Sequence, residues 1–255
     1  MLLEIRRLTK RFGGVQAVAD VDLAAESGSV LSLIGPNGAG KTTLINCISG
    51  QFLADSGVVG FRGEDITRLP PHERSKRGIA RTFQGARLFK GLSVFDNILI
   101  GRHTRMRSDV VAQLIPFGRQ AARSAGDLAK AGELLRLVDL DSRRRDLAGE
   151  LSYGEQRRLE IARALASEPS LLLLDEPAAG LNLAESARLR ELVRALAGAG
   201  LAIVLIEHDV RLVMGVSERV VVLNFGRKIG EGTPREVQAD PAVREAYLGV
   251  ADEAV

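Results

Sequence analysis

The 255-residue sequence has little of three things: cysteine, long apolar runs and an excess of one charge. Its single cysteine, Cys47, has no partner for an internal disulfide, and its apolar surroundings predict a packed structural thiol in a reducing compartment. No apolar run approaches the roughly 20 residues that a membrane-spanning helix requires. Lys and Arg number 35 against 32 Asp and Glu, so composition does not indicate nucleic-acid binding, although contact with anionic lipid is permitted.

The first ten residues carry charge at Glu4, Arg6 and Arg7 before any apolar segment develops. We therefore expect no signal peptide and a chain that is soluble by itself. The length fits one large α/β domain, or a compact core with a smaller subdomain, and either can bury a sizeable core.

Short apolar runs predict the strands of a buried sheet. Runs of this length suit strands covered on both faces, and the helical segments between them favour a mostly parallel sheet. The runs are Ser29–Gly35, Ser170–Glu176, Leu201–Glu207 and Arg219–Asn224. Other segments alternate apolar and polar residues, which predicts an antiparallel sheet beside the main one. They are Leu2–Leu8, Ala17–Glu26 and Gly57–Gly63.

Between about Gly85 and Gly149 the strand pattern disappears. Segments such as Ala125–Leu140 space their apolar residues three and four apart, as helices do, so we expect a helical subdomain inserted into the α/β core. The apolar stretch Val110–Gly118 is too short to span a membrane. Packing within the subdomain is its expected role, with a partner-binding surface as the alternative.

A glycine-rich stretch with the pattern G-x-x-x-x-G-K-[ST] directly follows the first buried run. It consists of Gly35, Pro36, Asn37, Gly38, Ala39, Gly40, Lys41, Thr42 and Thr43. In this pattern the glycines let backbone N–H groups surround phosphates, Lys41 reaches the β- and γ-phosphates, and Thr42 binds Mg²⁺. The alternative is a glycine-rich turn that contains a lysine by chance. The strand before the stretch and the apolar segment after it argue against that alternative.

Asp175 and Glu176 end the second buried run. A phosphate site of this kind holds its metal with an acidic residue at the end of a neighbouring buried strand, so we predict that Asp175 binds Mg²⁺ through water. Glu176 is the candidate base that orients and deprotonates the attacking water. Acidic pairs at strand ends are common as solvated turn residues, but the combination with the glycine-rich stretch favours a catalytic pair.

The stretch LSYGE, Leu151–Glu155, opens an amphipathic helix. Ser152 and Glu155 have the spacing of a capping box, in which each side chain bonds a free backbone N–H at the start of the helix. Gly154 weakens the first helical turn, and a glycine at such a place indicates that something approaches the backbone closely. Because N–H groups at a helix N-terminus bind anions, a phosphate is the predicted ligand.

With these motifs the chain resembles, over nearly its whole length, the ATP-binding subunit of ABC transporters. The resemblance implies an α/β fold: a P-loop NTPase core with a mostly parallel sheet, an N-terminal antiparallel β subdomain and an inserted α-helical subdomain. It further implies a single ABC ATPase domain. In this division, 1–84 and 151–255 form the ATP-binding core, and about 85–150 forms the helical subdomain that leads to the signature motif.

The resemblance also implies ATP and Mg²⁺ as cofactors and assigns further residues. In that family an L-S-G-G-Q-like motif binds the γ-phosphate of ATP held by the P-loop of a second copy, which assigns Ser152, Gly154 and Glu155 to a partner's nucleotide. Phe12 falls where the family stacks an aromatic ring on adenine, with an ordinary half-buried phenylalanine as the alternative.

Two more residues are assigned by their positions in that family. Gln84, in RTFQ, falls in the family's Q-loop, which senses the metal and the attacking water and links the core to the helical subdomain; it is assigned to catalysis and to the metal. His208, in IEHD, follows the run Leu201–Glu207 and matches the switch histidine that contacts the γ-phosphate.

Two residues depart from the family pattern. Tyr153 replaces the first glycine of L-S-G-G-Q, where it either crowds the partner's nucleotide or points away. Asn182 stands where many relatives have aspartate, which removes a charge from the dimer interface. Both departures, together with the stretches RTFQGARLFKGLSVFDNILIG and RRLEIARALA, look most like the ATPases of branched-chain or hydrophobic amino-acid importers.

That subgroup implies ATP hydrolysis that powers import through a membrane permease, by a peripheral protein at the cytoplasmic face of the inner membrane. The implied partners are a second ABC ATPase subunit in a head-to-tail dimer, either related or identical, integral membrane permease subunits and, indirectly, an extracytoplasmic solute-binding protein. No nucleic acid is expected.

Two alternatives stay open at this point. One keeps the transporter class with another cargo, as in lipopolysaccharide export or urea import. The other is a soluble ABC ATPase without a transport role, such as one for iron–sulfur assembly. DNA-repair and translation members usually contain two ATP cores or long coiled coils, whereas this sequence has one P-loop and no sustained heptads.

Overall fold

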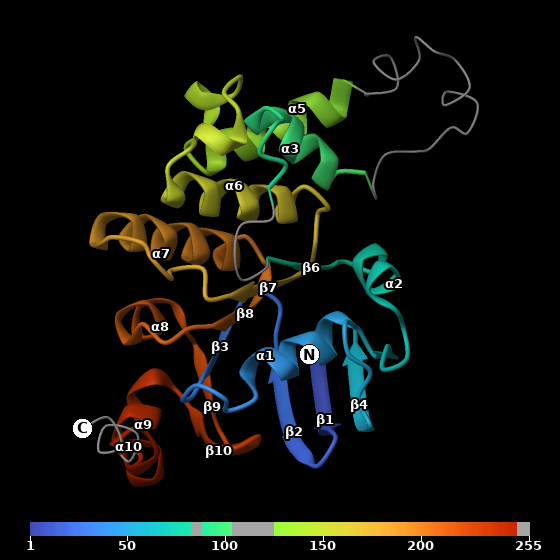
Figure 1. Ribbon diagram of the computed structural model, residues 1–255, viewed down its shortest axis with the longest axis vertical. Helices are drawn as coiled ribbons and strands as arrows, with labels where there is room; N and C mark the ends of the chain where they lie inside the picture. Colours follow the sequence, from blue (N-terminus) through green and yellow to red (C-terminus); the bar gives the residue numbers. More distant parts are fainter. Residues whose placement is uncertain (83–87, 104–124, 249–255) are drawn as a thin grey trace. The chain divides into compact units, whose positions relative to one another are not determined.

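The computed structural model describes residues 1–82, 88–103 and 125–248, which belong to two compact units (Figure 1). The first unit takes in Met1–Arg81 and Ser170–Val255, and the second takes in Thr82–Pro169. The helical segment expected at about 85–150 therefore falls within the second unit. This unit also contains the helix that begins after Ser152.

The first unit is built on a six-stranded sheet in the order β10-β9-β3-β8-β7-β6. The strands are β3 (Val30–Ile34), β6 (Ile79–Arg81), β7 (Leu171–Asp175), β8 (Ala202–Ile206), β9 (Arg219–Asn224) and β10 (Arg227–Gly232). Neighbours pair in parallel, apart from β10, which runs antiparallel to β9. Every residue of β7 and β8 is buried, as in strands covered on both faces. The predicted mostly parallel sheet is confirmed.

A second sheet in the same unit is antiparallel, in the order β2-β1-β4-β5. Its strands are β1 (Leu3–Phe12), β2 (Val15–Ala25), β4 (Ser56–Phe61) and β5 (Glu64–Asp65). The first three cover the segments whose alternating pattern predicted them, so the expected N-terminal antiparallel subdomain is confirmed. β1 shows why the alternation arises, because Leu3, Ile5 and Leu8 are buried while Glu4 and Arg6 are exposed.

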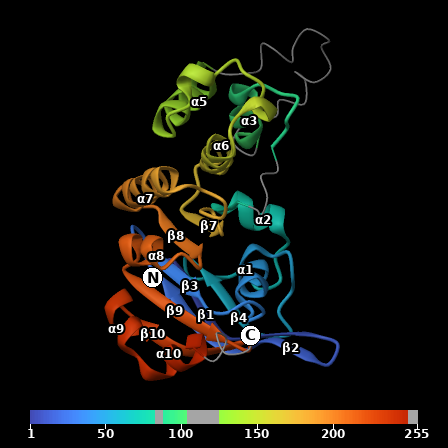
Figure 2. The same ribbon diagram turned by 60° about the vertical axis from the view of Figure 1, so that its left-hand side comes forward.

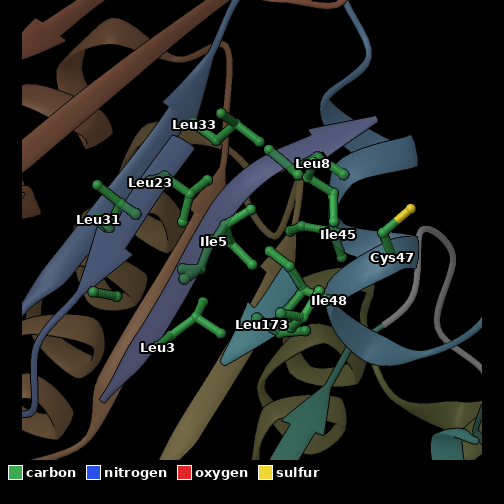
Figure 3. Packing of buried hydrophobic residues seen from close by; sticks show 14 of the residues in the cluster. Leu3, Ile5, Leu8, Leu23, Leu31, Leu33, Ile45, Cys47, Ile48 and Leu173 are labelled. Atoms are coloured by element: carbon green, nitrogen blue, oxygen red, sulfur yellow. The ribbon is translucent and has the colours of Figure 1, made fainter. Parts of the chain in front are cut away.

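One hydrophobic core joins both sheets to helix α1 (Lys41–Ser49), as Figure 3 shows. Leu31 and Leu33 of β3 reach it from the parallel sheet, and Ile45 and Ile48 reach it from α1. Cys47 lies in the same cluster, and burial raises the pKa of its thiol to about 11. The predicted packed thiol is confirmed. Because α1 is anchored in this core, the turn that precedes it is held at the edge of the sheet.

The opposite face of the parallel sheet has a smaller cluster. Side chains alternate between the faces of a strand, so Val221 of β9 enters the main core while Val220 and Val222 enter this cluster. The helices of the unit outside α1 are α2 (Pro71–Lys76), α7 (Leu183–Gly198), α8 (Val210–Val216), α9 (Pro234–Ala239) and α10 (Pro241–Leu248). Figure 2 shows α9 and α10 beside β10, against which both pack.

The second unit is helical in its described residues. It contains α3 (Val94–Gly101), α5 (Ala125–Leu137), α6 (Tyr153–Leu165) and two short 3₁₀ turns, Asp141–Arg143 and Ala148–Glu150. Helices α3, α5 and α6 pack on one another. At the crossing of α3 and α6, a Cβ on Gly101 would lie 2.2 Å from the carbonyl oxygen of Arg163, so only glycine permits this approach.

A buried arginine ties this unit together. Arg102 donates from Nε to Asp127 of α5 at 2.7 Å and from Nη1 to Glu168 at 2.9 Å.

Among the residues that the structure describes, no helix combines the length and the hydropathy that a membrane span requires. The stretch Val110–Gly118, expected to pack in this unit, lies outside the described residues.

Candidate nucleotide-binding site

The glycine-rich stretch forms the turn between β3 and α1. Gly35 has a φ of 150°, and a Cβ there would lie 2.1 Å from the carbonyl oxygen of Leu223. Gly40 has a φ of 99°, and a Cβ there would lie 2.2 Å from the carbonyl oxygen of Ala17. No side chain fits at either position, so the backbone of β9 and β2 fixes the two ends of this loop.

The start of α1 leaves its backbone N–H groups available to an anion. Gly40 is the N-cap and supplies no side-chain hydrogen bond, and the first turn contains no acidic residue. Thr42 in this turn is exposed and Thr43 is half-buried. The aligned peptide dipoles give the helix N-terminus a partial positive charge, and without a side-chain cap or an acidic residue this charge is left for a phosphate to bind.

Lys41 is buried inside the loop that it follows. Its Nζ donates hydrogen bonds to the carbonyl oxygens of Gly35 at 2.7 Å and Pro36 at 2.9 Å. Burial lowers the pKa of the ammonium, while the charges of Glu176 and Asp175 act in the opposite direction. The cation is therefore set in the loop with two carboxylates close enough to influence it.

Asp175 ends β7 and is 1% exposed. Its Oδ2 accepts a hydrogen bond from Nη2 of Arg81 at 2.9 Å. Burial raises the pKa of the Asp175 carboxyl, and the hydrogen bond and charge of Arg81 oppose that rise. The next residue, Glu176, has a φ of 48°, a left-handed conformation that is strained for a residue with a Cβ. Its N–H donates to the carbonyl oxygen of Ile206, which helps to hold this conformation.

His208 follows β8, and its side chain is 65% exposed. A groove brings it together with the glycine-rich loop and Glu176. The groove is lined by Gly35, Pro36, Asn37, Gly38, Ala39, Glu176, His208, Asn224, Phe225, Ile229, Ala242, Glu245 and Ala246. Three segments that are far apart in the sequence thus meet at one edge of the parallel sheet, where the carboxyl ends of the strands lie.

Several residues of this groove were not found from the sequence. The end of β9 contributes Asn224, the turn after it contributes Phe225, and α10 contributes Glu245. Phe225 is 85% exposed and has a φ of 44°, but an aromatic residue in a turn has no local pattern that marks it as part of a site. Glu207 and Arg81, which contact the site residues, were also missed.

Phe12 lies near the end of β1 and is 44% exposed. Its ring meets Phe52 edge-on at 5.2 Å between centroids, and Nζ of Lys10 lies 5.4 Å from its centroid. It is not among the residues that line the groove. Its predicted contact with adenine stays a prediction. Gln84 lies outside the described residues, so its predicted role also stays a prediction.

The LSYGE stretch forms the start of α6 in the helical unit. Oγ of Ser152 accepts from the N–H of Glu155 at 3.3 Å, and Oε2 of Glu155 accepts from the N–H of Ser152 at 2.8 Å. The predicted capping box is confirmed. Gly154 is buried in the first helical turn. The Ser152 N–H, one of the groups predicted to bind a phosphate, therefore already donates to the carboxylate of Glu155.

Tyr153 and Asn182 both have local partners. The hydroxyl of Tyr153 accepts from Nη2 of Arg157 at 2.7 Å, and the guanidinium lies 5.0 Å from the ring centroid. The tyrosine side chain is thus held along α6 by the residue one turn later. Asn182 caps α7, where its Oδ1 accepts from the N–H of Glu185 at 3.0 Å.

Comparisons of the sequence with known proteins agree with this geometry. A family model described as ABC transporter matches residues 18–179. A second, described as branched-chain amino acid ATP-binding cassette transporter, matches residues 227–253. The chain is 43% identical over 253 residues to the high-affinity branched-chain amino acid transport ATP-binding protein BraF of Pseudomonas aeruginosa. It is 41% identical over 253 residues to LivG of Escherichia coli strain K12, which has the same description, and both alignments cover 98% of each chain.

A relative with a different described cargo and two solved structures are also similar. The lipopolysaccharide export system ATP-binding protein LptB of Haemophilus influenzae is 36% identical over 248 residues, with 97% of each chain covered. The ADP conformation of an ATP-binding cassette of an ABC transporter has a TM-score of 0.86 at 33% identity and covers 97% of this chain and 98% of its own. A dimeric post-hydrolysis cassette bound to ADP and Pi has a TM-score of 0.77 at 25% identity, with 92% and 99% covered.

Proposed function

The chain belongs to the ABC transporter family and is an ABC-type ATPase, and on that premise we propose that it powers the import of branched-chain or other hydrophobic amino acids through a membrane permease. The observation that carries the site assignment is the single groove in which the P-loop, Glu176 and His208 meet. The proposed cargo is supported by the two relatives with that described role and by the match at residues 227–253.

ATP is the nucleotide proposed for this groove. The N–H groups of the loop and of the first turn of α1 face the phosphates, and Lys41 exchanges its two carbonyl partners for the β- and γ-phosphates. Phe12 is proposed to stack on the adenine. His208, whose exposed side chain lines the same groove, is proposed to contact the γ-phosphate.

Mg²⁺ fits the oxygen donors that lie near the P-loop. The exposed hydroxyl of Thr42 and the carboxylate of Asp175 would hold it, the latter through water, with Gln84 as a further ligand. Among the described residues no group of three or more His, Cys, Asp or Glu could hold a metal. This suits Mg²⁺, which keeps several waters and takes its remaining ligands from phosphates. When bound, the ion would neutralise charge that develops on the phosphate oxygens.

In the proposed reaction Glu176 is the base. Its carboxylate accepts a proton from the attacking water, whose oxygen forms a bond to the γ-phosphorus while the bond to the ADP oxygen breaks. Lys41 stabilises the negative charge on the phosphate oxygens. The hydrogen bond from the Glu176 N–H to Ile206 holds Glu176 at the edge of the sheet, in the groove that His208 also lines.

We propose that the site is completed by a second ATPase subunit in a head-to-tail dimer. ABC cassettes dimerise, as the dimeric relative bound to ADP and Pi illustrates. Ser152, Gly154 and Glu155 at the start of α6 would then face the γ-phosphate held by the partner's P-loop. The other proposed partners are permease subunits and, indirectly, an extracytoplasmic solute-binding protein. With these partners, the proposed location is the cytoplasmic face of the inner membrane, where the chain would act as a peripheral subunit.

Lipopolysaccharide export is the second candidate function, because a relative with that described role is also similar along 97% of the chain.

The deciding experiment purifies the Glu176→Gln chain from its native membranes with Mg²⁺ and ATP and identifies the proteins that accompany it. A polytopic permease and a second ATPase, with amino-acid uptake that Lys41→Ala abolishes, are the expected result. Recovery with soluble proteins alone, or with uptake unchanged in Lys41→Ala, would overturn the transport assignment.

A further inference from the structure

Glu207, the residue between β8 and His208, is a carboxylate buried at 1% exposure. Its Oε1 accepts a hydrogen bond from the N–H of Ala178 at 2.7 Å. Its Oε2 accepts from the N–H of His208 at 3.1 Å and, more weakly, from the N–H of Asp209 at 3.4 Å. One side chain thus joins the loop after Glu176 to the loop that carries His208.

The chemistry of this contact requires a carboxylate. Both oxygens of a carboxylate accept hydrogen bonds, whereas an amide has one acceptor and one donor group. A glutamine at position 207 would therefore turn an NH₂ group toward one of the backbone N–H donors. Burial raises the pKa of Glu207, but the hydrogen bonds from Ala178, Asp209 and His208 oppose that rise by favouring the charged form.

Together with Ile206, Glu207 holds the segment that contains the proposed base, Glu176. The N–H of Glu176 donates to the carbonyl oxygen of Ile206, and the N–H of Ala178 donates to the side chain of Glu207. Two consecutive residues at the end of β8 thus hold both ends of the tripeptide Glu176–Ala178. Because Glu176 has the strained φ of 48°, its conformation depends on contacts that hold it in place.

We propose that Glu207 is a positioning residue for ATP hydrolysis, which holds the loop of Glu176 and the loop of His208 in a fixed arrangement in the groove. The proposal rests on the proposed function of Glu176 and His208. Glu207 acts through backbone groups of the two loops and through the imidazole of His208, whose Nδ1 lies 3.9 Å from Oε2 of Glu207. Its effect falls on turnover because the P-loop, which we propose binds the phosphates, is held by other contacts.

The test compares Glu207→Gln with the wild-type full chain, purified together with any membrane subunits that accompany it. We expect kcat to fall at least about tenfold, with KM for ATP changing less than about threefold, since the lost contact acts on the chemical step. Hydrogen exchange should become faster at residues 176–179 and 207–209 while exchange at residues 35–43 stays unchanged. A merely structural role would lower thermal stability without this split between kcat and KM.

Glu218→Gln is the matched control. The carboxylate of Glu218 also accepts from a backbone N–H, that of Val30 at the opposite end of β3, away from the groove. The Glu218→Gln variant should keep the wild-type kcat. If Glu207→Gln does not fold, Glu207→Asp keeps the charge but shortens the reach to Ala178, and the same loss of kcat is expected. Wild-type kcat in a folded Gln or Asp variant would overturn the proposal.

A Glu176→Gln sample in the same series separates this proposal from the proposed function. If Glu176→Gln loses the hydrolysis of the wild type and Glu207→Gln keeps it, the positioning role is rejected and the proposed function stands. Normal hydrolysis in Glu176→Gln would reject the proposed base, and with it the reason for positioning.

Discussion

Nη2 of Arg81 lies 2.9 Å from Oδ2 of Asp175, and both side chains are buried in the nucleotide-binding unit. The same guanidinium donates from Nη1 to Asn46 and to Ser49 of α1. One cation therefore connects the end of β6, the end of β7 and the helix that follows the P-loop.

Replacing Arg81 with methionine should destabilise the protein. The substitution removes the positive charge beside a buried carboxylate, and breaking such a pair costs about 3–5 kcal/mol. We expect the free energy of unfolding, measured by urea denaturation, to fall by about that amount. Arg77→Met is the control, because the ion pairs of Arg77 with Glu73 and Glu64 are partly exposed and should be worth about 1 kcal/mol or less. Equal losses in the two variants would contradict the importance of the buried contact.

Lys41→Ala should abolish ATP binding, because the ammonium is the cation set in the phosphate-binding loop. Calorimetric titration with ATP measures the loss, and Lys76→Ala, which removes an exposed lysine, should bind normally.

Glu176→Gln should keep ATP binding, slow hydrolysis by about 10²–10⁴-fold and trap a nucleotide-bound dimer, since general-base catalysis contributes about that factor. Phosphate release and size-exclusion chromatography measure the two effects. Normal turnover in this variant would remove Glu176 from the role of base.

Glu155→Gln should strengthen ATP-dependent dimerisation. The Glu155 carboxylate sits at the Ser152 N–H where we propose that a partner's γ-phosphate binds, so like charges would meet there. Glutamine keeps an acceptor for the capping box and removes the charge. A charge interaction near the surface is worth about 0.2–1 kcal/mol, which corresponds to an affinity gain of about 1.4-fold to fivefold per site. Analytical ultracentrifugation with ATP measures the dimer affinity.

Glu236→Gln is the control for that effect, because Glu236 makes the same capping box with Thr233 at the start of α9. Dimerisation that weakens in Glu155→Gln, or strengthens equally in Glu236→Gln, would argue against a phosphate at the start of α6.

Cys47 should react with thiol reagents only when the protein unfolds. Burial raises its pKa to about 11, so about one thiol in a thousand is ionised at pH 8, and the side chain is inaccessible in the core. As this is the single cysteine, the labelling rate reports on one site. ATP should slow labelling further, because a ligand that binds the native state stabilises it. Rapid labelling in native buffer would show that α1 opens locally.

The strands and the helix starts could largely be predicted from the sequence because their signals are local. Buried runs such as Leu171–Asp175 carry their own apolar pattern, and the capping box of Ser152 and Glu155 joins residues one turn apart. Strands β6 and β10 were missed because one is three residues long and the other is polar and glycine-containing. β6 pairs with β7, which is distant in the sequence, whereas β10 forms a hairpin with the preceding strand β9.

The candidate site divides in the same way. The P-loop and the acidic pair could be proposed from short patterns that follow buried runs, and His208 from the resemblance to the family. The structure brings the loop, Glu176 and His208 together in one groove. No such pattern marks Glu207, because its role depends on a hydrogen bond from the N–H of Ala178, 29 residues away in the sequence. Arg81 likewise acquires its partner Asp175 across 94 residues.

The sequence by itself determined which residues we expect to bind phosphate, because the glycine-rich pattern between an apolar run and an apolar segment is local. The tertiary structure decided what those residues face. Parallel pairing of β7 with β8 brings Glu176 beside Ile206 and Glu207, and pairing of β3 with β8 and β9 brings the P-loop to His208 and Phe225. Hydrogen bonds between distant segments form only when the strands pair into the sheet, so no local pattern could reveal them.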